Sequence, residues 1–392
     1  MTLMPRPLIP KPTCLTADLM RILWLSENYP PRRGGMAQAC DRIVGNLRQA
    51  GLQIDIVFFT NAGHSFKSVQ QTNGRLLVVP AGDSPGHTLN CLYNYLSDPM
   101  HRVEYSHIVA FGGYLPVMAL PVFKAWLNSR AITMLRGNDF DLGVFSAQRR
   151  ALLADAVNIS EATCVLSSEA QQKVALLFPK AKLKLVANGV DSDSWRCESC
   201  DYEAAENWKK QNPAENRLTI GIIGQLKEKK GVIFFLENVL QAGLHESFRF
   251  LLIGDVEPQV QEWLNAKTDR LSIVQLPFLD RFELLRWYPV CDYVALPSHY
   301  DGMPNVLLEA GALAIPVIAA RVGGISEVLP ETLQQLTFHP GNAEDCREAL
   351  WQAARLNSEE RHEIGESFAG HVARHFSSQR ETKGYLKIFN AL

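Results

Sequence analysis

Short, continuous apolar runs recur along the first half of the chain and alternate with segments of helical periodicity. The runs are Ile22–Leu25, Ile54–Phe59, Leu76–Val79, Ile108–Phe111, Ile132–Leu135, Thr163–Leu166 and Leu183–Val186. Helical patterns such as Ala37–Ala50 and Gln148–Ile159 lie between several of them. Because buried strands that alternate with helices are typical of a parallel sheet covered on both faces, the pattern predicts a doubly wound α/β domain.

The same pattern restarts in the second half of the chain. Asn188-Gly189-Val190-Asp191 predicts a turn, and a stretch rich in Asp, Glu, Ser and Asn follows it to about Asn216. New strand-like runs are Leu218–Ile223, Phe248–Ile253, Ser272–Gln275, Tyr293–Leu296 and Val317–Ala319. We therefore predict two Rossmann-like, doubly wound parallel-sheet domains that face a central cleft, which is the default ligand site.

The pattern also gives domain limits. We expect a disordered extension over 1–20, an N-terminal domain over 21–190, a linker over 191–215, a C-terminal domain over 216–375 and a last segment over 376–392. The extension holds four prolines and no apolar core of a secretory signal, and Met20 is an alternative start.

Composition is that of a globular protein, with 47% apolar and 20% charged residues. The net charge of −2 argues against nucleic acid as a partner. The charge is uneven, since residues 1–190 hold 19 Lys and Arg against 12 Asp and Glu, and residues 191–392 hold 20 against 29. A basic N-terminal half would suit an anionic lipid surface or an anionic acceptor, but a chance division between two solvated surfaces is an equal alternative.

Cysteine usage and hydropathy favour a cytoplasmic protein. Among eight cysteines only Cys197 and Cys200 form a CxxC pair, which cannot complete a four-ligand zinc site alone. The most apolar stretch, Ile108–Leu127, is interrupted by glycines, prolines and a lysine, so we expect no membrane span. Peripheral attachment of the protein to the inner face of a membrane is an alternative that the sequence does not exclude.

The strongest chemical signal is a segment that follows one strand and opens a helix, Ser298-His299-Tyr300-Asp301-Gly302-Met303-Pro304-Asn305-Val306-Leu307-Leu308-Glu309. Pro304 suits the first helical turn, and the free N–H groups there attract a phosphate. Asp301 and Glu309 can point into the same cleft and accept hydrogen bonds from sugar and ribose hydroxyls. The alternative is that Asp301 only caps the helix and that Glu309 lies on its solvent face.

This segment, with Pro316-Val317-Ile318-Ala319-Ala320 and Val322-Gly323-Gly324 after it, resembles the retaining glycosyltransferases of family 4, which have the GT-B fold. That family carries an acidic residue and a Glu eight positions apart, as Asp301 and Glu309 are. The family usually has Glu where this chain has Asp301, which shortens the reach by one methylene. The resemblance covers most of residues 20–392 and implies that residues 376–392 form a helix that crosses back to the first domain.

Three further pieces resemble the family's donor site. Gly34-Gly35 matches the glycine loop, where Gly35 would lie against the donor diphosphate and sugar. Arg136, which precedes Gly137-Asn138-Asp139, stands where the family often has a His that reaches the donor sugar. The alternative role for Arg136 is a structural ion pair with Asp139 or Asp141. Lys230 matches the family's phosphate-binding Lys, whereas Gln225 replaces its Arg, and Lys227 or Lys229 could supply the missing charge.

The resemblance implies an enzyme that moves a hexosyl group from a nucleoside-diphosphate sugar to an acceptor with retention of configuration, without a metal or another cofactor. As catalytic residues it implies Asp301, Lys230, Glu309 and Arg136. As donor-binding residues it implies Gly35, Gln225, Lys230, Gly302, Met303, Pro304, Asn305, Val306, Leu307 and Glu309. As candidates on the acceptor side it implies Gly34 and Asp139.

Two alternatives share the expected fold. The first is a non-catalytic sugar-nucleotide-binding protein or partner subunit, which Gln225 and Asp301 motivate. The second is a nucleotide-sugar epimerase. A hydrolase is rejected, because Pro85 follows the serine of the GxSxG match at Gly82–Gly86 and has no N–H for an oxyanion hole. The donor, the oligomeric state and the acceptor, whether glycan, lipid or small molecule, are left open.

Overall fold

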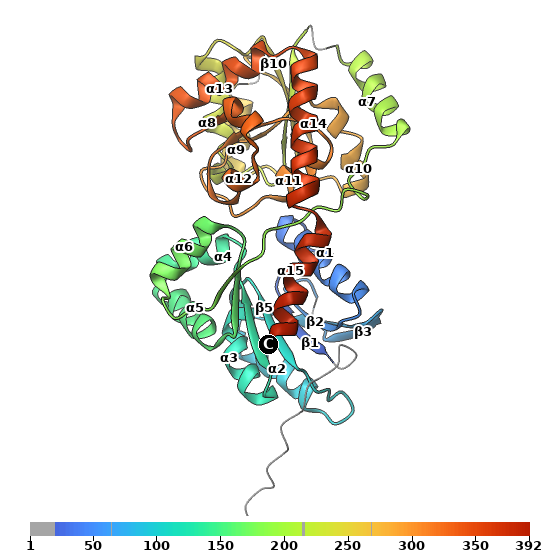
Figure 1. The fold of residues 1–392 in the computed structure, drawn as a ribbon, viewed down its shortest axis with the longest axis vertical. Helices are drawn as coiled ribbons and strands as arrows, with labels where there is room; N and C mark the ends of the chain where they lie inside the picture. Colours follow the sequence, from blue (N-terminus) through green and yellow to red (C-terminus); the bar gives the residue numbers. More distant parts are fainter. Residues whose placement is uncertain (1–19, 64, 214–215, 268) are drawn as a thin grey trace, which may run out of the picture.

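The structure, a computed structural model, describes residues 20–392 except 64, 214–215 and 268. Most of the extension expected over 1–20 therefore lies outside the described residues. The chain forms two α/β domains, which lie one above the other in Figure 1. Each domain is built on its own sheet, so the predicted division of the chain into two doubly wound domains is confirmed.

The N-terminal domain contains an eight-stranded sheet in the order β3-β4-β2-β1-β5-β6-β7-β8. Its strands are β1 Arg21–Ser26, β2 Gln53–Thr60, β3 Lys67–Gln71, β4 Gly74–Pro80, β5 His107–Phe111, β6 Arg130–Met134, β7 Ala162–Val165 and β8 Leu183–Leu185. All neighbours pair in parallel except β3 and β4. The sequence pattern missed β3, because this edge strand is mostly exposed and contains one apolar residue, Val69.

Helices cover both faces of this sheet. They are α1 Gly35–Gln49, α2 Pro85–Ser97, α3 Tyr114–Leu127, α4 Asn138–Asp141, α5 Ala147–Ile159 and α6 Ser168–Leu177, with a 3-10 turn over Gly143–Phe145. Apolar side chains of α2, α3 and α5 fill the core on one face, and those of α1 fill the core on the other. The expected apolar strands in the middle of the sheet are therefore buried on both sides, whereas the edge strand β8 is partly exposed.

The C-terminal domain contains a six-stranded parallel sheet in the order β11-β10-β9-β12-β13-β14. Its strands are β9 Leu218–Ile223, β10 Phe248–Ile253, β11 Ser272–Leu276, β12 Tyr293–Leu296, β13 Val317–Ala320 and β14 Thr337–Phe338. Its helices are α8 Val232–Gln241, α9 Pro258–Asn265, α10 Arg281–Leu285, α11 Asn305–Ala312, α12 Gly323–Val328, α13 Ala343–Arg355 and α14 Ser358–His375, with 3-10 turns over Glu228–Lys230, Tyr288–Val290 and Glu331–Leu336. In both sheets the strand order reverses beside the first strand, and such a switch point is where α/β domains bind ligands.

The segment expected as a linker over 191–215 contains a helix, α7 Ser199–Gln211, which is a correction to the sequence interpretation. A reciprocal capping box between Glu198 and Asp201 starts this helix. The indole of Trp208 packs edge-on against Trp287 of the C-terminal domain, with ring centroids 5.5 Å apart. This polar segment therefore packs on the C-terminal domain.

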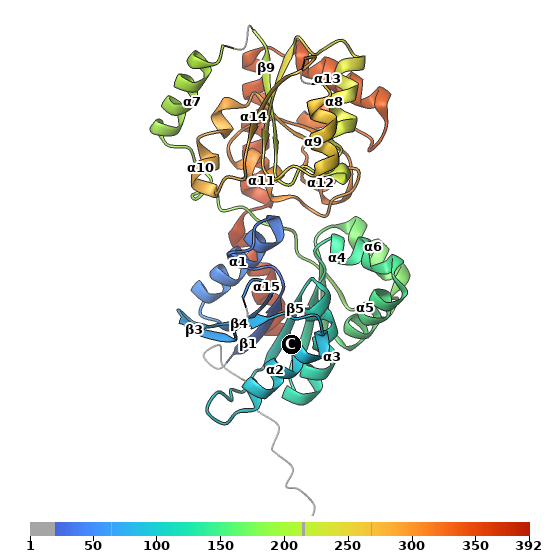
Figure 2. The same ribbon diagram turned by 180° about the vertical axis from the view of Figure 1, so that it is seen from behind.

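The last helix, α15 Ser378–Ala391, lies beside α1 of the N-terminal domain (Figures 1 and 2). Its Tyr385, Ile388 and Phe389 complete the core on that face of the N-terminal sheet. Arg42 of α1 donates to the buried carboxylate of Glu381 at 3.0 Å. No helix in the described part of the chain is long and apolar enough to cross a membrane.

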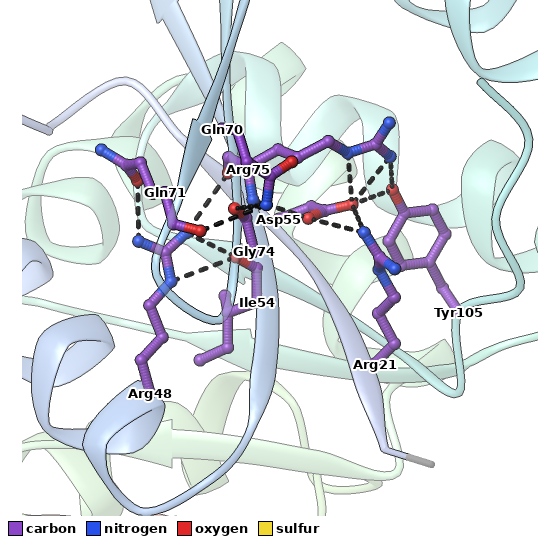
Figure 3. Close-up of polar contacts among 9 residues, drawn as sticks. All are labelled: Arg21, Arg48, Ile54, Asp55, Gln70, Gln71, Gly74, Arg75 and Tyr105. Atoms are coloured by element: carbon purple, nitrogen blue, oxygen red, sulfur yellow. Dashed lines mark hydrogen bonds and ion pairs between the residues drawn. The ribbon is translucent and has the colours of Figure 1, made fainter. Parts of the chain in front are cut away.

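At the end of the N-terminal sheet opposite the cleft, Asp55 forms a buried ionic cluster (Figure 3). Arg21 and Arg75 donate to its carboxylate at 3.0 and 2.8 Å, and the Tyr105 hydroxyl donates at 2.7 Å. Burial alone would raise the pKa of the Asp55 carboxyl, but the hydrogen bonds from Arg75 and Tyr105 and the two arginine charges outweigh burial and lower that pKa. The cluster ties β1, β2 and β4 together.

We expect Asp55→Asn to destabilise the N-terminal domain by about 3 kcal/mol at pH 7, because it leaves two arginines without their buried counter-charge. The native pKa of Asp55 lies below its unfolded value, so this stability is present above about pH 4 and is lost as the pH falls through the native pKa. Urea unfolding of the wild type and the variant at pH 7 and pH 3 measures both effects. A loss below 1 kcal/mol at pH 7 would contradict the importance of the cluster.

Candidate functional site

A cavity with a volume of about 1310 Å³, part of it open to solvent, lies between the two domains. The N-terminal domain contributes Arg33, Gly34, Gly35 and Arg136, and the C-terminal domain contributes Gln225, Lys230, Asp301, Gly302, Met303, Pro304, Asn305, Val306 and Glu309. Most of the predicted site residues thus meet around one cavity, although they are far apart in the sequence.

The turn from Asp301 to Pro304 connects β12 to α11 and forms one wall of this cleft. The helix begins at Asn305, directly after Pro304, and the side-chain Nδ2 of Asn305 donates across the cleft to the carbonyl of Gly35 at 3.1 Å. Gly323 packs against the turn with φ of +53°, and a Cβ on it would lie 1.9 Å from the carbonyl oxygen of Asp301. Only glycine fits there, which explains its place after β13.

Leu307 is the predicted donor-binding residue that the structure does not place in the cleft. Its side chain is fully buried in the core of the C-terminal domain. One turn of α11 has a cleft side and a core side, and Leu307 lies on the core side, whereas Val306 and Glu309 line the cavity.

Lys230 and Asp301, which both line the cleft, form an ion pair. Gly231, with φ of +65°, follows Lys230, and a Cβ there would lie 2.0 Å from the carbonyl oxygen of Pro297. This close approach holds the turn of Lys230 against the loop that carries Asp301. Asp301 makes no capping hydrogen bond to α11, so the interpretation of Asp301 as a helix cap is wrong.

Glu309 is buried and lines the cleft, so the interpretation that it lies on a solvent face is wrong. The hydroxyl of Tyr288 donates to its carboxylate at 2.9 Å. Burial raises the pKa of the Glu309 carboxyl to about 7, and the Tyr288 hydrogen bond and the charge of Arg42 only partly offset this rise. Glu309 therefore changes its charge near neutral pH.

Arg136 connects four parts of the chain at the edge of the cleft. Its guanidinium donates to the Tyr385 hydroxyl at 3.1 Å and to the Asn188 side-chain carbonyl, and it lies 5.0 Å from the centre of the Phe111 ring. Asn188 in turn donates to the Met303 carbonyl at 2.7 Å. This chain of contacts links α15 to the turn of the acidic motif, and Asn188 is a residue that the motif analysis missed.

Asp139, an expected acceptor-side residue, does not line the cleft. Its carboxylate accepts the backbone N–H of Arg136 at 2.9 and 3.0 Å, while the guanidinium of Arg136 bonds elsewhere. The expected alternative of an Arg136 ion pair with Asp139 or Asp141 is therefore wrong. Burial raises the pKa of the Asp139 carboxyl to about 6. Asp139 fixes the turn after β6.

Two more residues that the motif analysis missed face the cleft. Arg33 lies 4.7 Å from the centre of the Phe278 ring, so a cation of the N-terminal domain stacks on an aromatic side chain of the C-terminal domain. The basic pair Arg32-Arg33 directly before the glycine loop could have indicated Arg33 as a site residue. Phe278 could not be identified from the sequence, because it lies in a loop outside any motif.

Of the two lysines that could supply the charge missing at Gln225, only one lines the cavity. Lys229 lines the cleft together with Gln225, whereas Lys227 does not. Burial, and next the charge of Lys230, lower the pKa of the Lys229 ammonium. Lys229 also lies 5.4 Å from the centre of the Tyr300 ring.

We expect Lys229→Ala to raise the KM for an anionic nucleotide ligand about fivefold, because it removes one of the cleft's cations. The matched control is Lys227→Ala, which changes the same turn outside the cavity and should alter KM less than twofold. Steady-state kinetics in a single buffer measure both. Equal effects of the two variants would show that the position of Lys229 in the cleft does not matter.

No group of three or more His, Cys, Asp or Glu side chains in the described residues is placed to hold a metal ion.

Comparison with known proteins agrees with this geometry. Residues 217–355 match the family model "Glycosyl transferases group 1". The uncharacterized glycosyltransferase MJ1607 of Methanocaldococcus jannaschii is 20% identical over 358 residues, which cover 87% of this chain and 90% of that protein.

Two solved structures show the same fold. Anabaena Alr3699/HepE in complex with UDP-glucose superposes with a TM-score of 0.78 at 16% identity, over 95% of this chain and 100% of that one. Sucrose-phosphate synthase (tll1590) from Thermosynechococcus elongatus superposes with a TM-score of 0.79 at 16% identity, over the same shares. The chain thus shares the GT-B fold of these two proteins, and residues 217–355 of its C-terminal domain are similar to the glycosyl transferases group 1.

Proposed function

We propose that this chain is a retaining glycosyltransferase that moves a hexosyl group from a nucleoside-diphosphate sugar to an acceptor hydroxyl. The observation that carries the proposal is the cleft, where Lys230, Asp301 and Glu309 of one domain face Arg33 and Gly35 of the other around one cavity. The complexes of structural neighbours with UDP and UDP-glucose make UDP-glucose the first donor to test.

The donor fits the cleft with its diphosphate at Lys230 and the N–H groups at the start of α11, where positive charge and helix dipole attract phosphate. Glu309, which is buried and lines the cavity, would accept hydrogen bonds from the ribose hydroxyls. Phe278 would lie against the base. Asp301, held by Lys230, would accept hydrogen bonds from the transferred sugar.

The chemistry requires stabilisation of the leaving diphosphate. The bond between the anomeric carbon and the phosphate oxygen breaks with its electron pair on that oxygen, and Lys230 faces the developing charge. The acceptor oxygen bonds to the same face of the anomeric carbon, and its proton passes to the departing diphosphate. The carboxylate of Asp301 is paired with Lys230, and that of Asp139 accepts the backbone N–H of Arg136. Because both carboxylates already have partners, we assign no side-chain nucleophile. Retention rests on the resemblance of the acidic motif.

The positive charges of Lys229, Lys230 and Arg33 would take the place that a divalent cation has in metal-dependent transfer, so the proposed reaction needs no metal or other cofactor. We further propose that the protein acts in the cytoplasm, where nucleotide sugars are made.

A donor screen tests the proposal. Thermal unfolding is measured with UDP, GDP, ADP and their common hexose derivatives in EDTA, and release of the diphosphate is followed for each sugar. We expect a rise of several degrees in Tm with one diphosphate and slow release of it from its sugar form. A rise in Tm without release of the diphosphate would indicate a binding protein, and an epimerised donor would indicate an epimerase. A folded sample whose Tm does not change with any of the compounds would contradict a nucleotide-sugar site.

A further inference from the structure

The last strand of the N-terminal sheet, β8, is an edge strand, and no further strand among the described residues pairs with its outer side. The segment 170–190, which contains β8, has four lysines and no Asp or Glu, although the whole chain has a net charge of −2. Lys180, Lys182 and Lys184 of this segment are exposed. Because side chains alternate along an extended strand, Lys182, Lys184 and Val186 point to the same face of the sheet.

The helix α15 lies on that face, in front of the N-terminal sheet in Figure 1 and behind it in Figure 2. Val186 belongs to the core that α15 completes, and a Cβ on Gly384 would lie 3.2 Å from the Val186 side chain. The exposed residues Arg380, Lys383 and Lys387 are three and four positions apart, so they form one outer ridge of α15. Strand and helix thus each present cations beside this contact.

The two groups of cations also lie at the same level of the domain. Asn188, just after β8, lines the cleft, so β8 runs toward the cleft, whereas α15 starts beside the cleft and runs away from it (Figure 1). Measured from the contact between Val186 and Gly384, Lys184 lies about 7 Å back along the strand. Lys387 lies about 4.5 Å further along the helix, in the same direction. Lys184 and Lys387 are therefore neighbours on the surface.

We define the basic stripe as Lys180, Lys182, Lys184, Arg380, Lys383 and Lys387. Within the part of the chain that the structure describes, none of these six side chains pairs with a carboxylate. The single acid of α15, Glu381, is buried and bound to Arg42. On the neighbouring α1, Asp41 faces Tyr29, since burial and next the charge of Asp41 raise the pKa of Tyr29 to about 12. The stripe is thus a row of uncompensated cations, which attracts an anionic surface.

On the opposite face of the same sheet edge, apolar side chains are exposed. Leu176 and Leu177 at the end of α6 are 81% and 49% exposed, and Leu185 of β8 is 47% exposed. Because α6 packs on β8, these leucines border the edge that carries the lysines. Leucines that enter the acyl region beside lysines that reach the head groups suit an anionic bilayer. Nucleic acid would leave the leucines in water.

Lysines on an edge strand can also prevent pairing with a second sheet. That role accounts for Lys182 and Lys184, but it accounts neither for the cations of α15 nor for the exposed Leu176. An anionic bilayer accounts for all of them.

We propose that the basic stripe and the three leucines beside it dock this protein on a membrane surface that contains anionic phospholipids. None of these residues lines the cleft, so docking leaves the cleft open. The proposal goes beyond the proposed function, because docking requires neither donor nor acceptor.

Flotation of the full chain with lipid vesicles tests the proposal. One set of vesicles contains phosphatidylcholine alone, and the other contains about 30% phosphatidylglycerol as the anionic lipid. We expect binding to the anionic vesicles, at least tenfold weaker binding to the neutral ones, and release in about 0.5 M NaCl. Equal binding to both sets, or binding to neither, would overturn the proposal. A preference for a DNA duplex over the anionic vesicles would overturn it as well.

A pair of matched double variants locates the docking surface. Lys184→Gln with Lys387→Gln should weaken binding to anionic vesicles about 20-fold, because each cation near such a surface contributes about fivefold in affinity. The control, Lys67→Gln with Lys210→Gln, removes the same charge at exposed positions of β3 and α7 and should weaken binding less than twofold. Equal effects of the two double variants would overturn the assignment of the stripe.

Leu176→Asn tests the apolar part of the surface. It should weaken binding to anionic vesicles about tenfold, because an exposed leucine that enters the bilayer loses its contact with water. Binding equal to that of the wild type would overturn the role of the leucines. Thermal unfolding checks that each variant is folded. Diphosphate release without vesicles should be unchanged in every docking variant, so a failure of docking is distinguished from a failure of the proposed function.

Discussion

Lys230→Ala should lower the rate of diphosphate release from the donor by about 100-fold. Lys230 lies in the cleft, paired with Asp301. In the proposed reaction, negative charge would develop beside it on the leaving diphosphate. Removing one preorganised electrostatic group of this kind costs on the order of 100-fold or more in rate. The effect should appear in kcat, with a smaller rise in KM, since the charge on the leaving group grows during bond breaking.

Two variants make the result specific. Lys230→Arg keeps the positive charge and should recover at least tenfold of the lost rate. Lys210→Ala, at an exposed position of α7, should behave like the wild type. Thermal unfolding checks that each variant is folded. A folded Lys230→Ala variant with the wild-type rate would remove Lys230 from the site.

Glu309→Gln should lower kcat/KM for the donor by about tenfold at pH 8 and have little effect at pH 5.5. A hydrogen bond from a ribose hydroxyl to an ionised carboxylate contributes about 1.5–3 kcal/mol, and 1.4 kcal/mol corresponds to tenfold. The pKa of Glu309 is about 7, so the wild-type carboxyl is ionised at pH 8 and neutral at pH 5.5, where glutamine resembles it. The wild-type profile of kcat/KM should therefore decline below pH 7, and the variant should lack this decline.

The raised pKa of Glu309 has the opposite effect on the stability of the folded protein. The pKa of Glu309 is raised in the folded state, so folding becomes less favourable as the pH rises from its unfolded value, near 4.5, to about 7. Glu309→Gln should accordingly raise Tm at pH 8 and not at pH 4. The control is Glu262→Gln on the exposed side of α9, which should change neither kinetics nor Tm. If the two pH profiles of kcat/KM coincide, Glu309 does not contact the donor as an ionised group.

The sequence was sufficient to predict the fold, because buried parallel strands are encoded by continuous runs of apolar residues. Each expected strand, from Ile22–Leu25 to Val317–Ala319, corresponds to a strand of the structure. The strands that it missed, β3 and β14, lack that signal, since β3 is polar and exposed and β14 has two residues. The helix α7 was missed because its sequence is mostly polar and it contacts the C-terminal domain through single side chains such as Trp208 and Lys209.

For the site, motif spacing was informative where residues act along one helix or turn. It brought Lys230, Asp301, Glu309 and Arg136 to one cavity, but the side chain of Leu307, expected to bind the donor, lies in the core of the C-terminal domain. Contacts between segments far apart in the sequence could not be found in this way. Asn188 reaches Met303, and Arg33 reaches Phe278, only because the two domains face each other.

Proton NMR of a UDP-glucose solution with the protein in EDTA tests the central claim most directly, and the same experiment extends to the GDP and ADP sugars. The anomeric protons report both the loss of donor and the configuration of the sugar released to water before it equilibrates. We expect one of these donors to yield its diphosphate and, first, the sugar with the donor's own α configuration. Folded protein that releases nothing from any donor, or that first releases the β-anomer, would contradict a retaining glycosyltransferase.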